Sequence, residues 1–129
     1  MALRITLFAT LLLTLVNTGC ATTIRNDPGG HVINYAINAQ KAKFVRFDGK
    51  CMSACTLYLS VRNTCITPRA SFHFHRPYGS SPEGNAIALR FMMEQYPLWV
   101  RDWIDDQGGL TDEWLVIDYR TAALYMRTC

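Results

Sequence analysis

The pattern of hydrophobic and polar positions divides the chain into helical and extended stretches. Apolar residues recur at three- and four-residue spacing in three places, which predicts helices over 32–41, 53–61 and 85–107. Short stretches rich in β-prone residues lie between them and predict extended segments over 22–25, 43–47, 65–66 and 70–74. Pro97 stands inside the longest helical stretch, so we expect that helix to kink or split there.

The order of these elements predicts the fold class. Strands that alternate with helices are typical of a small α/β layer structure, in which parallel strands are joined by right-handed crossovers. A further helical region is expected from Thr111 through Ile117, continuing or restarting over 122–126. The chain has 129 residues and 50% of them are hydrophobic, which is enough for one compact domain and too little for two.

The N-terminal residues have the composition of an export signal. Arg4 supplies a positive charge, and the apolar run 5–16 is shorter than the roughly 20 residues that a membrane-spanning helix needs. We therefore expect a signal peptide over 1–21, cleaved after Ala21, and a single domain over 22–129.

A lipoprotein signal that ends at residue 19 is the alternative, because Gly19-Cys20 resembles a lipidation junction. A lipid on Cys20 would then be the only contact with a membrane that we expect. Asn17 favours simple release, since a lipoprotein signal usually has an aliphatic residue three positions before the cysteine. Both versions place the domain outside the cytoplasm, in the periplasm or in the medium.

The distribution of charge argues against a nucleic-acid partner. Arg4 is the one basic residue of the signal, so 12 of the 13 Lys and Arg residues remain against 10 Asp and Glu residues. Neither kind forms a run, whereas a nucleic-acid-binding domain usually shows a basic stripe with interleaved aromatic residues.

The cysteines predict disulfides. Export leaves an even number in a compartment where disulfides persist, namely Cys51, Cys55, Cys65 and Cys129. Two bridges are expected, and all three pairings of four cysteines stay open. Zinc is the competing interpretation, but oxidised thiols do not bind metal, and His73 and His75 lie only two residues apart on a strand-like run. We therefore expect no metal.

Three segments offer the parts of a serine nucleophile site. Ser53 lies where a predicted helix begins, so its oxygen and the N–H of Ala54 would lie at the positive end of that helix. The pair 29–30 is Gly-Gly, a loop able to present a second N–H to an oxyanion, and His75 ends a predicted strand and could act as base. The alternative role for Ser53 is that of a helix N-cap.

The order of these motifs resembles the proteolytic subunit of the Clp protease, whose fold the crotonase superfamily shares. The resemblance is carried, in order, by Asp27-Pro28-Gly29-Gly30, Cys51-Met52-Ser53-Ala54-Cys55, Cys65-Ile66-Thr67-Pro68 and His75-Arg76-Pro77. It covers most of 23–118 and is closer to small exported relatives of the family with a Cys-x-Ser-Ala-Cys signature. It implies a reduced ClpP/crotonase-like fold, with short and mostly parallel strands, crossover helices and a long C-terminal helix.

The resemblance also implies roles for individual residues. Ser53 would be the nucleophile and His75 the base, and the N–H groups of Gly30 and Ala54 would hold the oxyanion. By approximate position, Asp118 would be the third member of a triad. The chain departs from the family pattern in two ways, because Arg76 replaces a glutamine and most strands that precede the glycine turn are missing.

Several assignments have alternatives. The acid could instead be one of three neighbouring aspartates, Asp105, Asp106 and Asp112, and a Ser–His dyad and an inactive fold are also open. His73 is the second candidate base, because strand alternation places it on the same face as His75. His31 is interpreted as a surface residue, and the tryptophans at helical positions as core or as a self-association face, namely Trp99, Trp103 and Trp114.

The resulting hypothesis is an exported serine hydrolase that acts on peptide, acyl or ester bonds without a cofactor. The alternative is a non-catalytic, disulfide-stapled envelope domain that uses the same fold to bind a partner. Oligomers are compatible with both.

Overall fold

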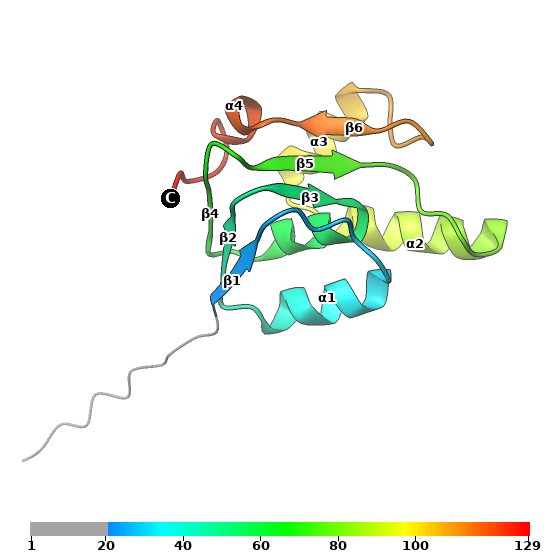
Figure 1. Ribbon diagram of the computed structural model, residues 1–129. Helices are drawn as coiled ribbons and strands as arrows, with labels where there is room; N and C mark the ends of the chain where they lie inside the picture. Colours follow the sequence, from blue (N-terminus) through cyan, green and yellow to red (C-terminus); the bar gives the residue numbers. More distant parts are fainter. Residues whose placement is uncertain (1–20) are drawn as a thin grey trace, which may run out of the picture.

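The computed structural model describes residues 21–129, so the predicted signal peptide and Cys20 lie outside the described residues. The chain is an α/β structure of short strands and helices (Figure 1). The elements are β1 (Ala21–Ile24), α1 (Val32–Lys41), β2 (Phe44–Phe47), β3 (Lys50–Met52), the 3-10 helix η1 (Ser53–Ser60), β4 (Thr64–Ile66), β5 (Ser71–Phe74), α2 (Pro82–Gln95), α3 (Leu98–Asp106), β6 (Leu115–Ile117) and α4 (Tyr119–Ala122).

The strands form two three-stranded sheets. One has the order β1-β2-β4 and is entirely parallel, and the other has the order β3-β5-β6, in which β3 and β5 are parallel. Twice the chain runs from a strand of the first sheet to one of the second and then into a helix, first through β2, β3 and η1 and then through β4, β5 and α2. Helices α1 and α2 both contact η1 and lie on the same side of the sheets (Figure 1).

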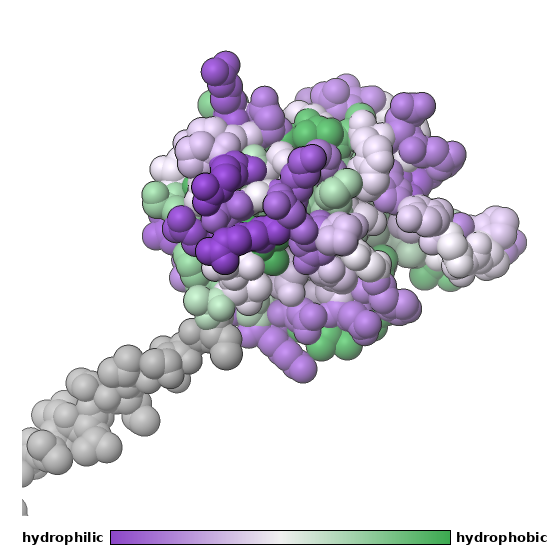
Figure 2. Space-filling view, viewed as in Figure 1, coloured by the Kyte–Doolittle hydropathy of each residue, from purple (hydrophilic) through white to green (hydrophobic). Residues whose placement is uncertain are grey.

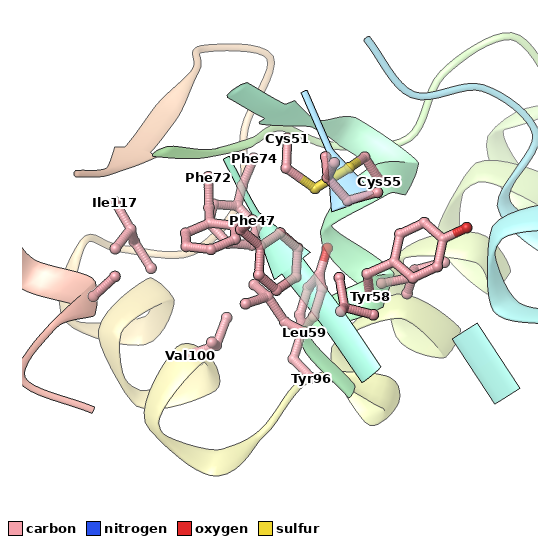
Figure 3. Close-up of a cluster of buried hydrophobic side chains, with 14 of the residues drawn as sticks. Phe47, Cys51, Cys55, Tyr58, Leu59, Phe72, Phe74, Tyr96, Val100 and Ile117 are labelled. Carbon is pink, nitrogen blue, oxygen red and sulfur yellow. A yellow bond between two sulfur atoms is a disulfide. The ribbon is translucent and has the colours of Figure 1, made fainter. Parts of the chain in front are cut away.

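The core lies where the two sheets meet the helices. Buried aromatic side chains from both sheets pack edge to face there, and the ring centroids of Phe47 and Phe72 are 4.9 Å apart (Figure 3). Aromatic side chains bury large apolar areas, so this cluster dominates the stability of a domain of this size. The face of the molecule shown in Figure 2, which is viewed as in Figure 1, is mainly hydrophilic, with separate hydrophobic groups, one of them over α1.

Two expectations about regular structure are confirmed and three are wrong. The long helix does split at Pro97, which separates α2 from α3. The region 53–60 is helical, but as a 3-10 helix rather than an α-helix. The apolar residues of 32–41 were all expected to face the sheets, but in α1 only Ala36 and Ala39 are buried, and half of Ile33 is exposed to solvent.

The third wrong expectation concerns the region before Asp118. A helix was predicted through Ile117, but Leu115–Ile117 is strand β6, which pairs antiparallel with β5. Three residues carry too little periodicity to distinguish strand from helix, and here the ladder of backbone hydrogen bonds to β5 decides the conformation.

Two disulfides are present, as the cysteine count predicted. Cys51 is bonded to Cys55, four residues away, and Cys65 to Cys129, 64 residues away. Two bridges fit an oxidising compartment. Within the part of the chain that the structure describes, no helix has the length and hydrophobicity needed to cross a membrane.

Candidate active site

Ser53 occupies a sharp turn between β3 and η1. Its φ angle is +54°, in the left-handed region that a residue with a side chain avoids at a cost of about 1 to 3 kcal/mol. Strained strand-to-helix turns of this kind present the nucleophilic serines of α/β-hydrolases. The N-cap of η1 is Met52, and no side chain caps the helix, so the capping role considered for Ser53 is wrong. Among the described residues its hydroxyl has no hydrogen-bond partner.

Two hydrogen bonds, made through Thr56, stabilise the backbone of this turn. The Thr56 hydroxyl donates to the carbonyl oxygen of Ser53 at 2.6 Å, and its Oγ1 lies 2.6 Å from the Tyr96 hydroxyl. Since a carbonyl only accepts, the Thr56 proton is committed to Ser53, and Tyr96 must donate to Thr56. Burial raises the pKa of Tyr96, so this hydroxyl keeps its proton.

The glycine turn, residues 27–30, packs closely against residues 52–54. Gly29 has a φ of +84°, and a Cβ there would lie 2.5 Å from the Met52 carbonyl oxygen and 2.9 Å from the Ser53 Cβ. Only glycine fits this approach. The turn is joined to β3 by two backbone bonds, from the Asp27 N–H to the Lys50 oxygen at 2.8 Å and from the Met52 N–H to the Asp27 oxygen at 2.9 Å.

Asp27 decides which glycine N–H remains free. Its Oδ1 accepts from the Gly29 N–H at 2.8 Å and from the Tyr35 hydroxyl at 2.7 Å. Burial, together with Asp27, raises the pKa of Tyr35, so the phenol remains a donor. The Gly29 N–H is therefore occupied, whereas the Gly30 N–H has no acceptor within residues 21–129.

His75 follows β5 and is largely buried, with 8% of its surface exposed. Its Nδ1 is hydrogen-bonded to the carbonyl oxygen of Arg76. That oxygen can only accept, so Nδ1 carries the proton and Nε2 of the neutral ring has a free lone pair, as a general base requires. The rings of Trp114 and Tyr78 lie beside the imidazole, with centroids 4.2 Å and 5.2 Å away.

A single cleft brings the nucleophile turn, the glycine turn and the histidine together. It has a volume of about 280 Å³ and is lined by residues of five segments: Pro28, Gly29, Gly30, Val32, Ser53, His75, Pro77, Tyr78, Met92 and Trp114. Ser53 and His75 face this cleft without a hydrogen bond between them in the described residues. Contacts of this kind often tighten only when substrate is bound.

Asp118 is not brought to His75, and its predicted role as the triad acid is wrong on geometric grounds. In the β5–β6 register Phe74 pairs with Leu115 and Phe72 with Ile117, so Asp118 lies at the opposite end of β5 from His75. Its carboxylate caps α4 by accepting from the Thr121 N–H at 2.9 Å, which also lowers its pKa. The Arg76 carbonyl occupies the position on Nδ1 that a triad acid would take.

The alternative acid Asp112 and the alternative base His73 contact residues other than Ser53 and His75. Asp112 lies near the cleft, but its carboxylate pairs with Arg76 at 3.1 Å rather than with His75. His73 Nε2 is 2.8 Å from the Ser71 hydroxyl, and burial lowers the pKa of this histidine. His31 is exposed, as expected. Of the two strand histidines, only His75 lines the cleft with Ser53.

Sequence reasoning missed several residues that shape the site. Trp114 was expected in a helix, but it precedes β6 and lies against His75. Thr56 and Tyr96, which are 40 residues apart, gave no sequence signal of their contact. Asp27 was noted only as part of the glycine motif, although an Asp before Pro-Gly commonly accepts a backbone N–H two residues on.

Within the described residues, no group of three or more His, Cys, Asp or Glu side chains could hold a metal ion. Comparison with protein-family models and with curated proteins finds no match to this chain.

Proposed function

We propose that this chain is an exported serine hydrolase of ClpP/crotonase-like fold, which works with a Ser53–His75 dyad. One observation carries the proposal: Ser53 is held in a left-handed conformation, with an uncommitted hydroxyl, in the same cleft as His75. Backbone conformations that cost free energy cluster at functional sites, and the Ser53 side chain neither caps η1 nor makes a hydrogen bond within residues 21–129.

The dyad would work by covalent catalysis. Ser53 Oγ attacks the carbonyl carbon of the substrate while His75 Nε2 takes the hydroxyl proton. The carbonyl π electrons move to its oxygen, where the N–H groups of Gly30 and Ala54 donate to the oxyanion. When the oxyanion collapses, the alcohol or amine leaves with the proton from His75, and water then hydrolyses the acyl-serine by the same steps.

His75 would need no carboxylate for this role. The Arg76 carbonyl oxygen orients the ring and selects the tautomer with the proton on Nδ1. A carbonyl stabilises the imidazolium less than a carboxylate does, because it carries no net charge. We therefore expect slow turnover in comparison with a complete triad.

The acyl part of the substrate is expected to be apolar and uncharged. A groove of about 480 Å³ adjoins the cleft and shares Gly30, Val32, Pro77 and Tyr78 with it. Its other walls come mainly from α1 and α2, with Ile87 61% exposed, and no Asp, Glu, Lys or Arg of residues 21–129 lines it. An apolar chain that leaves the carbonyl carbon could be buried there.

A serine-directed fluorophosphonate tests the proposal. The full chain would be exported into an oxidising host compartment, purified and incubated with the probe beside Ser53→Ala, with intact mass as the readout and circular dichroism to show that both are folded. We expect one adduct on the wild type and none on the variant. A folded wild type that stays unlabelled would contradict the proposal.

The second candidate is a non-catalytic envelope domain that binds an apolar ligand. The apolar groove and the absence of a Ser53–His75 hydrogen bond within the described residues favour it. It predicts no labelling, together with protection of the groove when short-chain fatty acids or apolar peptides are added. Hydrogen exchange of α1 and α2 measures that protection.

A further inference from the structure

The disulfide Cys51–Cys55 encloses the proposed nucleophile. The two cysteines are four residues apart, their Cα atoms are separated by 5.3 Å, and Ser53 is the middle residue of the ring that they close. The left-handed φ of Ser53 therefore lies inside the smallest covalent loop of the described chain. A ring of this size permits few backbone conformations.

Both ends of this ring are anchored. Cys51 belongs to β3, which pairs with β5 in register Cys51 to Phe72. Neither cysteine is exposed to solvent, and Figure 3 shows their bond at the edge of the aromatic cluster that contains Phe47 and Phe72. The disulfide therefore connects the turn to the buried core.

We propose that the Cys51–Cys55 disulfide is the positioning element of the nucleophile. It holds Ser53 in the left-handed region, so that the Ser53 hydroxyl remains in the cleft and the Ala54 N–H remains beside the glycine turn. Without the bond, Ser53 relaxes to an ordinary φ, and both groups move away from Gly30 and His75. This inference rests on the proposed hydrolase function and adds to it a covalent determinant of reactivity.

The test compares two pairs of substitutions in the full chain. Cys51→Ala with Cys55→Ala removes the enclosing bond, and Cys65→Ala with Cys129→Ala is the matched control that removes the distant one. The second-order rate constant of fluorophosphonate labelling is measured on folded protein. We expect a fall of roughly tenfold to a hundredfold for the first pair, as for small displacements of catalytic groups, and no change for the second.

A second readout makes the inference testable even in an unreactive protein. Amide hydrogen exchange of 52–55 should rise in the first pair and stay unchanged in the second. Labelling of the first pair at the wild-type rate would overturn the inference. If the wild type itself is not labelled, the hydrolase proposal fails, and unchanged exchange over 52–55 would then overturn the positioning role as well.

Discussion

The two disulfides differ in what they join and therefore in what they do. Cys65–Cys129 links β4 to the C-terminal residue across 64 positions, whereas Cys51–Cys55 spans four positions around Ser53. In the chain-entropy model, a bridge contributes about 4 kcal/mol to folding for the longer loop and about 2 kcal/mol for the shorter one. The long bridge is the more effective in limiting the unfolded chain.

The surroundings of the two bridges also assign stability to the long bridge and site geometry to the short one. Near the C-terminus, the Ile66 N–H donates to the Arg127 oxygen at 3.0 Å and the Cys129 N–H to the Ile66 oxygen at 2.9 Å, so the bridge secures a segment at the edge of the first sheet. The short bridge lies beside a backbone conformation that opposes folding. Global stability and the geometry of the site thus depend on different covalent bonds.

Removal of the long bridge should give the largest change in stability. Cys65→Ala with Cys129→Ala is expected to lower the free energy of unfolding by about 4 kcal/mol, measured by urea denaturation. The same variant should label normally under conditions where it is folded. A loss smaller than that caused by removing Cys51–Cys55 would reverse the comparison.

Replacing Ser53 with glycine should abolish reactivity while it increases stability. Ser53→Gly is expected to abolish labelling and to raise the free energy of unfolding by about 1 kcal/mol, because glycine adopts a positive φ without steric cost. Ser53→Ala is the control, since it also loses the hydroxyl but keeps the unfavourable φ. Equal stability of the two variants would show that the turn is not strained.

The buried hydroxyl pair below the ring should have a smaller effect. Tyr96→Phe leaves Thr56 bonded to Ser53 but removes its second partner, which should cost about 1 kcal/mol of unfolding free energy. Tyr125→Phe, on an exposed tyrosine stacked against Trp99, is the control and should change little. Thermal denaturation of the two variants side by side checks this expectation.

The response to acid should come from Asp48, which lies at the opposite end of β3 from Ser53. Hydrogen bonds from Arg69 and Thr67 hold the pKa of buried Asp48 at about 2, below its ordinary 3.8. A depressed pKa contributes stability that is present above about pH 4 and is lost as the pH falls toward 2. Asp48→Asn should make the free energy of unfolding less dependent on pH in this acid range. Asp112→Asn, at an exposed ion pair, should leave that dependence unchanged.

Sequence reasoning was most successful where the deciding interactions are local. Helical spacing located α1, η1 and α2, and the missing N–H of Pro97 predicted the break before α3. It missed β3 and predicted a helix where β6 lies, because both elements exist only through their neighbours. The strands β3 and β6 have three residues each, and their conformation follows from pairing with β5.

The residues of the candidate site show the same difference between what local sequence predicts and what contacts between distant segments decide. Ser53, His75 and Gly30 were proposed from motif order, and the structure places them around one cleft. The acid was misplaced, because the approximate position of Asp118 contained no information on register. The Arg76 carbonyl could not be predicted as the partner of His75, since every residue has a carbonyl and only the local backbone path directs this one.

The sequence by itself determined the α/β class, the break at Pro97 and the presence of two disulfides, because periodicity, ring chemistry and cysteine count act within short segments or by composition. Only the tertiary structure decided which cysteines pair, that Trp114 lies against His75, and that Ser53 has a left-handed backbone. Each of these depends on contacts between segments distant along the chain, or on a turn whose angle is held by the atoms packed around it.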